Sequence, residues 1–152
     1  MSKKFDTIIR RAEKKDIFSM IELLGELFDI ERDFAFDFNL HQRGLNLLVE
    51  SEKDAIFVCE VDAKVVGMIS VQRILSTAMG SYVGLIEDVV VKKEFQKSGI
   101  GSKLIDEAKL YSRQCGYERI HLLCDEDNPP AEKFYKKLKF KKSDLRAWYY
   151  FL

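Results

Sequence analysis

Two adjacent carboxylates, Glu87 and Asp88, stand directly before three valines in the segment EDVVVKKEFQKSGIGSKL, residues 87–104. A carboxylate within such an apolar, strand-like run is costly to bury unless it is paired, hydrated or exposed. Side chains of a regular strand alternate between its two faces, so Glu87 would share a face with the odd-numbered residues from Val83 to Val91, and Asp88 would point the other way. The alternation therefore predicts that the two carboxylates point in opposite directions and that Asp88 supports the scaffold.

The same segment then becomes basic and reaches Gly99 and Gly101, which open a helix expected at about 99–114. A helix that begins through glycines presents unpaired N–H groups at the positive end of its dipole, and pyrophosphate is the best-matched common anion. A Walker loop needs four residues between its first glycine and the Gly-Lys pair. Here one residue separates the two glycines, so a Walker loop is excluded. A dinucleotide fingerprint would need a third glycine where Leu104 stands. A glycine turn that serves only tight helix packing remains the alternative.

The elements that must position these residues form a mixed sheet with helices on both faces. The strand, helix and strand across residues 83–124 are expected to form a right-handed parallel crossover. No linker divides the chain, so residues 1–152 are predicted to form a single domain. The expected elements are, in order, a strand at 5–12, a helix that begins at Ile17 and is capped by Asp16, a helix at about 39–50, a hairpin at 55–74 turning near 62–64, a loop at 76–81, a strand at 82–91, the helix at 99–114 ended by Gly116, a strand at 118–125, a short helix at 131–138 and a strand-like tail at 139–152.

The pattern Gln96-x-x-Gly99-x-Gly101 after a valine-rich strand resembles the acyl-CoA pyrophosphate loop of the GNAT superfamily of N-acetyltransferases. NPPAEKFYKKLKF, residues 128–140, resembles the next landmark of that family, an Asn at a turn followed by a short helix bearing Phe-Tyr. VVGMISV resembles its central strands. The resemblance covers nearly the whole chain. It implies an α/β (α+β) fold with a mixed, mostly antiparallel central sheet flanked by helices, in which a splayed parallel strand pair forms the acetyl-CoA cleft. The first position of this loop is Gln96 here, whereas Arg is commoner at that position in the family, which accepts both residues.

The resemblance implies an enzyme that transfers the acetyl group of acetyl-CoA directly to a primary amine. Glu87 would take the proton of the amine, directly or through water, and Tyr135 would protonate the departing thiolate. Their alternatives are a structural salt bridge or backbone cap for Glu87 and a packing role for Tyr135. The expected acetyl-CoA contacts are the backbone of Val89, Val90 and Val91 and the side chain of Asn128 for the pantetheine, and Gln96, Lys97, Ser98, Gly99, Ile100, Gly101 and Ser102 for the pyrophosphate.

The acidic and aromatic stretch DIERDFAFDF, residues 29–38, stands where the family's substrate-binding segment usually lies. Phe28, Glu31 and Asp33 are therefore expected to bind the acceptor, since acidic and aromatic groups suit an amine with apolar or extended cationic character. A loop without a ligand role is the alternative. The amine itself, a small molecule or a peptide, and the use of longer acyl groups stay open. A different class of function, a non-catalytic acyl-CoA sensor or partner-binding module on the same fold, also stays open.

Composition narrows the partners. Lys and Arg number 25, as do Asp and Glu, so the formal net charge is zero and the chain is not expected to bind nucleic acid. No apolar run is long enough for a membrane span or a signal peptide. Three cysteines without metal-type spacing favour a reduced, cytoplasmic protein without a metal. The aromatic C-terminal segment AWYYFL is a candidate to pair across a homodimer.

Overall fold

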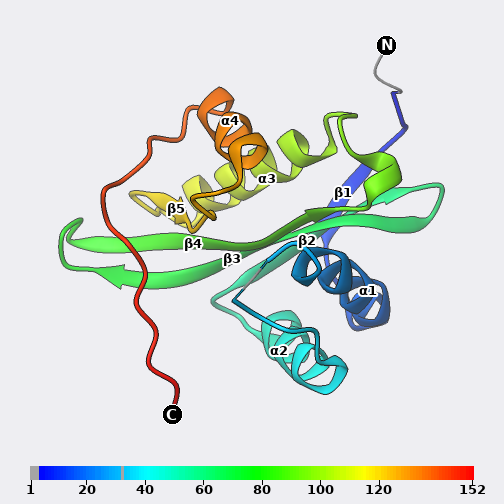
Figure 1. Cartoon of the computed structure of the whole chain (residues 1–152), viewed down its shortest axis with the longest axis horizontal. Coiled ribbons are helices and arrows are strands. Elements are labelled where there is room, and N and C mark those ends of the chain that lie inside the picture. Colours follow the sequence, from blue (N-terminus) through cyan, green and yellow to red (C-terminus); the bar gives the residue numbers. More distant parts are fainter. Residues whose placement is uncertain (1–3, 32) are drawn as a thin grey trace. The chain divides into compact units, whose positions relative to one another are not determined.

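The computed structural model describes residues 4–31 and 33–152 (Figure 1). The chain separates into two compact units, Met1–His121 and Leu122–Leu152, and each is described by itself. The first unit contains most of the sheet and three of the four α-helices. None of the helices in the described ranges is long and apolar enough to cross a membrane.

A five-stranded sheet in the order β1-β2-β3-β4-β5 forms the framework. The first four strands pair in antiparallel fashion, and β5 runs parallel to β4. The expected mixed, mostly antiparallel sheet is therefore confirmed. The strands are β1 (Ile8–Arg11), β2 (Ala55–Val61), β3 (Lys64–Ser76), β4 (Ser81–Val91) and β5 (Ile120–Leu122).

Helices cover both faces of this sheet. The helices α1 (Ile17–Phe28) and α2 (Phe38–Glu50) lie on one face, and α3 (Ile100–Gln114) lies on the other (Figure 1). Two short 3-10 helices, Lys14–Asp16 and Lys93–Phe95, precede α1 and follow β4. Gly67 lets α3 approach closely, because a Cβ atom there would lie 3.2 Å from the Leu104 Cδ1 atom. The α1/α2 side of the core contains Met20, Leu23, Leu45, Ile56, Met68 and Val90, all buried.

The turn between β2 and β3 confirms the predicted hairpin. Asp62 and Ala63 form the two-residue loop, with φ of 49° and 60°. Two positive φ values are the signature of a type I′ turn, whose twist matches that of the flanking strands. The turn sets the pairing of its first residues, and the register shifts by one residue between Glu60 and Cys59.

A β-bulge interrupts the pairing of β3 with β4. Between the pairs Ser70–Glu87 and Met68–Val90, one residue of β3 faces two residues of β4, and the register shifts. Asp88, the first of the two, has a φ of 53°, which Asp and Asn tolerate better than β-branched residues. An extra residue of this kind locally bends a strand and re-aims its side chains.

The bulge makes the expected alternation along β4 wrong from Asp88 onward. Partners in an antiparallel pair share a face, and Ser70 and Met68 are two residues apart on β3. Glu87 and Val90 therefore share a face, whereas strict alternation puts them on opposite ones. Val90 packs into the α1/α2 core, which fits this assignment.

Asp16 does not cap α1 as expected. Its carboxylate accepts hydrogen bonds from the Arg10 guanidinium at 2.7 and 2.8 Å and from the Glu13 N–H at 2.8 Å. Arg10 also donates to Glu60 at 2.9 Å, so the cluster ties β1 and β2 to the turn before α1. The bonds from Arg10 hold the pKa of the buried Asp16 below its usual range.

Three expected strands are shorter or absent. β1 begins at Ile8 rather than residue 5, and β5 keeps only Ile120–Leu122 of the expected 118–125. The tail at 139–152 was expected to be a strand, but the described residues after α4 (Pro129–Lys137) form none. Trp148 and Leu145 in this tail are at least 90% exposed. Aromatic and apolar composition alone does not make a strand, because β-propensity mainly reflects packing against neighbours.

Candidate active site

An open cavity of about 440 Å³ is lined by residues of α1, α2, β3, β4 and the connection between α2 and β2, and we call it the α1–α2 cavity. Helix α2 supplies one wall, since its residues at positions 40, 44, 47 and 48 recur at helical spacing. Strands β3 and β4 supply the polar end. The lining residues are Leu24, Phe28, Leu40, His41, Gly44, Leu45, Leu47, Leu48, Ser51, Asp54, Gln72, Glu87 and Asp88.

Glu87 lies at the polar end, as expected for a site residue. Its side chain is exposed, and its Oε2 atom accepts a hydrogen bond of 2.9 Å from the Gln72 Nε2 atom. Its backbone carbonyl accepts a bond of 3.0 Å from the hydroxyl of the fully buried Ser70. The neighbouring strand β3 therefore holds both the backbone and the carboxylate of Glu87.

Asp88 lines the same cavity, so the expectation that it points away from Glu87 is wrong. The bulge at its own position re-aims the side chain. Within 4–31 and 33–152, no group donates a hydrogen bond to its partly buried carboxylate. Burial raises the pKa of Asp88 to about 7, and the charges of Glu87 and Glu31 act in the same direction. Near neutral pH, Asp88 can therefore both accept and release a proton.

His41 also lines the cavity, although nothing in the sequence pattern indicated a role for it. Its imidazole stacks on Phe28 with ring centroids 4.8 Å apart and lies 5.0 Å from the ring of Phe36. Its Nε2 atom accepts a bond of 3.0 Å from the N–H of Asp37, whose carboxylate in turn caps α2. The aromatic residues of the α1–α2 connection thus pack against the start of α2.

The three expected acceptor-binding residues have different positions. Phe28 lines the α1–α2 cavity. Glu31 is close enough to Asp88 to affect its pKa. Asp33 is exposed and does not line the cavity. Only the first two therefore lie in or near the cavity.

The glycine turn has the geometry of an anion site. Lys97 and Gly99 have φ of 58° and 90°, and α3 begins at Ile100. The first intrahelical bond runs from the N–H of Lys103 to the carbonyl of Gly99 at 3.1 Å. The preceding N–H groups, including those of Ile100, Gly101 and Ser102, have no intrahelical partner, as at every helix start. Left-handed residues interspersed with ordinary ones turn such groups into a concavity that suits an anion.

Hydrogen bonds close the loop onto the end of β4. The Gln96 Nε2 atom donates to the carbonyl of Val91 at 3.0 Å, and the Ser98 hydroxyl donates to the carbonyl of Phe95 at 2.5 Å. The chain thus runs without interruption from the two carboxylates through three valines to the glycine turn. The side chain of Val90 packs in the core, so Val90 can meet a ligand only through its backbone, whereas Val89 and Val91 are partly exposed.

The second unit holds Asn128 and Tyr135 on α4. Asn128 caps the helix, because its Oδ1 atom accepts a bond of 3.2 Å from the N–H of Ala131. The ring of Tyr135 lies 5.2 Å from that of Phe134 and 5.7 Å from that of Phe140, and its side chain is partly buried. A capping role for Asn128 and a packed ring for Tyr135 are therefore part of the structure of this unit.

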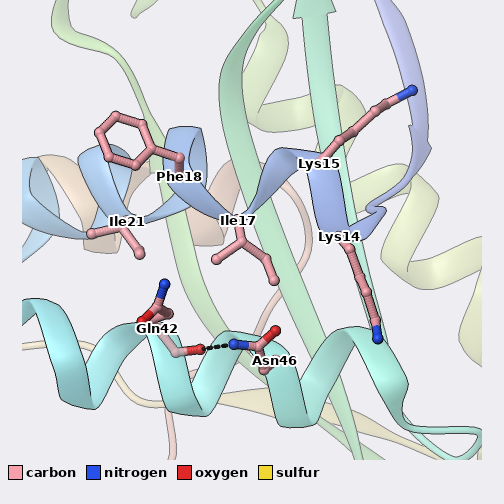
Figure 2. A pocket seen from close by; sticks show the side chains of 7 residues that line it. All are labelled: Lys14, Lys15, Ile17, Phe18, Ile21, Gln42 and Asn46. Carbon is pink, nitrogen blue, oxygen red and sulfur yellow. Dashed lines mark hydrogen bonds between the residues drawn. The ribbon is translucent and has the colours of Figure 1, made fainter.

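Figure 2 shows a second pocket, of about 330 Å³, between the start of α1 and α2. Lys14 and Lys15 at its edge point in different directions (Figure 2). Each pairs with a glutamate, Lys14 with Glu50 at 2.5 Å and Lys15 with Glu13 at 3.1 Å. The bond drawn there joins the Asn46 side chain to the backbone of its own helix. Its polar groups do not converge on one point, so this pocket is not the candidate site.

Comparison with known families agrees with the fold. The family model described as "Acetyltransferase (GNAT) family" matches residues 17–140. The chain belongs to the GNAT acetyltransferase family. The family and enzyme class expected from the sequence are confirmed.

Individual relatives share the acetyltransferase description. An uncharacterised N-acetyltransferase of Methanocaldococcus jannaschii is 31% identical over 103 residues, which are 66% of this chain and 46% of that protein. The chain thus spans less than half of that relative. An aminoalkylphosphonate N-acetyltransferase of Salmonella typhimurium is 28% identical over 148 residues, 91% of this chain and 87% of that protein. The crystal structure of an aminoglycoside N-acetyltransferase in complex with CoA has a TM-score of 0.83 at 16% identity, covers 99% of this chain and 97% of its own, and shows the shared fold.

Proposed function

We propose that this GNAT-family chain transfers the acetyl group of acetyl-CoA directly to a primary amine held in the α1–α2 cavity. The observation that carries the proposal is the continuity of β4 with the glycine turn. The strand presents two carboxylates to an open, largely apolar cavity and leads within a few residues to the anion-binding start of α3. Proton acceptor, thioester-binding backbone and phosphate anchor thus follow one another along residues 87–102.

The residues of the loop fit acetyl-CoA. A pyrophosphate would meet the N–H groups of Gln96–Ser102 and the positive end of α3, and the left-handed φ of Gly99 leaves room for its approach, since no atom lies within 4 Å of a Cβ built there. The backbone of Val89, Val90 and Val91 and the side chain of Asn128 would hold the pantetheine arm. Bound acetyl-CoA supplies an acyl group that is already activated as a thioester.

The protein supplies the proton transfers. An alkylammonium has a pKa near ~10 and must lose a proton before its nitrogen can attack. Glu87 accepts this proton, directly or through water, and its charge is one of the causes that raise the pKa of the adjacent Asp88. The N–C bond forms as the C–S bond breaks, a backbone N–H near Val89 stabilises the carbonyl oxygen, and Tyr135 protonates the departing sulfur.

Two measurements test the proposal. Acetyl-CoA or CoA at about 100 times its dissociation constant should add roughly 2.7 kcal/mol to the free energy of unfolding, whereas ATP and NAD should add little. Release of the CoA thiol should then depend on an added primary amine. A larger response to ATP or NAD would contradict the assignment of the glycine turn. Binding of CoA with no turnover of any amine would instead favour an acyl-CoA-binding module.

A further inference from the structure

The walls of the α1–α2 cavity differ in chemistry from its polar end. The walls are aliphatic and aromatic side chains of α1 and α2, and the polar end contains the carboxylates of Asp54, Glu87 and Asp88. Among the described residues that line the cavity, none is a lysine or an arginine. An anionic group placed there would meet like charges without a cationic partner.

The three carboxylates have different hydrogen-bond partners. Asp54 accepts bonds of 2.8 Å from the Arg73 N–H and from the Ser51 hydroxyl, and Glu87 accepts one from Gln72. Both are therefore held by the protein itself. Asp88 accepts no hydrogen bond from any described residue, although its side chain is partly buried in the cavity wall. A partly buried acceptor without a donor in the free protein suits a ligand that brings a donor, and an ammonium carries three.

The volume of the α1–α2 cavity and the positions of its apolar lining residues further restrict the kind of ligand that fits. The volume of about 440 Å³ lies at the lower end of the range for small-molecule pockets. Leu24, Phe28 and Leu45 offer the ligand apolar surface beside the carboxylates. A ligand that fits both parts has an ammonium at one end and an apolar body at the other.

Resting on the proposed transferase function, we propose that the acceptor is a small primary amine with an apolar alkyl or aryl body and without a phosphate or phosphonate group. Its ammonium lies against Asp88 and Glu87, and its body lies between α1 and α2. The apolar walls select the body, and the unneutralised carboxylates reject anionic amines. Substrate choice is thus determined by the cavity, separately from the loop that binds phosphates.

The matched probes are 2-phenylethylamine and 2-aminoethylphosphonate, which share an ethylamine arm and differ only in the group at its end. With acetyl-CoA saturating, kcat/KM for 2-phenylethylamine should exceed that for 2-aminoethylphosphonate at least about tenfold, a difference of about 1.4 kcal/mol. The thermal stabilisation by each amine, measured with and without CoA, should follow the same order. Equal or better use of the phosphonate would overturn the inference and leave the transferase function intact. Stabilisation by neither amine would also overturn it, whereas failure of CoA to bind would contradict the function alone.

A variant of the cavity wall tests the electrostatic argument. Leu47 lines the cavity and is 68% exposed, so Leu47→Lys introduces a cation at little risk to folding. The preference for 2-phenylethylamine should fall at least about threefold, because the anionic probe gains a partner. Leu110→Lys on α3, on the other face of the sheet, makes the same change outside the cavity and should leave the preference unchanged. An equal effect of both variants would refute the cavity as the source of selectivity.

Discussion

Replacement of Asp88 by Asn tests the unusual position of this carboxylate. Asn has nearly the same shape and adopts the left-handed φ of 53° readily, so the bulge should persist. The folded state raises the pKa of Asp88 from 3.8 to about 7, so it favours the protonated form. The contribution of protonated Asp88 to the free energy of unfolding is therefore fully present below the pKa of Asp88 in the unfolded chain. It is lost as the pH rises through about 7.

The size of the effect follows from the two pKa values. Because ionisation of Asp88 is harder in the folded than in the unfolded state, linkage lowers the free energy of unfolding by about 1.7 kcal/mol at about pH 5 and by about 4 kcal/mol at about pH 8. Asp88→Asn removes this cost, so its stability relative to the wild type should increase by roughly 2–3 kcal/mol between these pH values. For a chain of this length, the relative gain in Tm is on the order of 5–10 °C. Solvent in the open cavity makes these values upper estimates.

Urea unfolding and thermal scans of the wild type and of Asp88→Asn, at about pH 5 and about pH 8, measure this difference. Glu87→Gln removes one of the charges that raise the pKa of Asp88, so the stability of this variant should depend on pH less steeply than that of the wild type. The reasoning would be refuted if the difference in the free energy of unfolding between Asp88→Asn and the wild type changed by less than about 0.5 kcal/mol between the two pH values.

Activity provides a second measurement. The rate should rise as Asp88 loses its proton near pH 7, and Asp88→Asn should abolish that step in the pH–rate profile.

Three further pairs of variants test the rest of the site. Gly44→Ala should stabilise α2 by about 0.5–1 kcal/mol in urea unfolding. Gly44→Phe should fill the α1–α2 cavity and lower kcat/KM at least about tenfold, and full activity of this variant would contradict the assignment of the cavity as the acceptor site. Gly99→Ala and Gly116→Ala each place a side chain at positive φ at an end of α3, so each should lower the free energy of unfolding by about 1–2 kcal/mol. In a titration with acetyl-CoA, only Gly99→Ala should weaken binding. Tyr135→Phe should lower turnover about a hundredfold and leave the thermal shift with acetyl-CoA unchanged, and Tyr150→Phe in the exposed tail should change neither; equal loss of turnover and binding would refute the acid role.

The features that the sequence predicted well depend on neighbours in the chain. The Asp62–Ala63 turn and the glycine start of α3 need only a few consecutive residues to form. Gly99 and Gly116 mark the two ends of α3 because left-handed φ favours glycine. Local backbone chemistry is visible in a single sequence, so these elements were placed correctly.

The features that the sequence missed depend on partners far along the chain. The phase of β4 changes at Asp88 because of its register with β3, and a count of alternating residues along β4 contains no information on that register. The sequence does contain one local signal, since Asp is a poor strand former placed within a β-branched run. The α1–α2 cavity combines Phe28, His41, Gln72 and Glu87, which no periodicity connects. The tail was expected to be a strand on composition, which says nothing of whether a partner strand is within reach.

The bulge also bears on how β4 tolerates changes in length. If a chain lacked Asp88, Ser70 would still oppose Glu87, Met68 would still oppose Val90, and the single residue between them on each strand would form an ordinary pair. The ladder would become regular and would lose its one left-handed residue, so the sheet itself does not need Asp88. A one-residue deletion at this point is therefore compatible with folding but removes the carboxylate from the cavity. Among sequences of this fold, the presence or absence of that residue would separate chains that keep both carboxylates in the cavity from chains that retain only the scaffold.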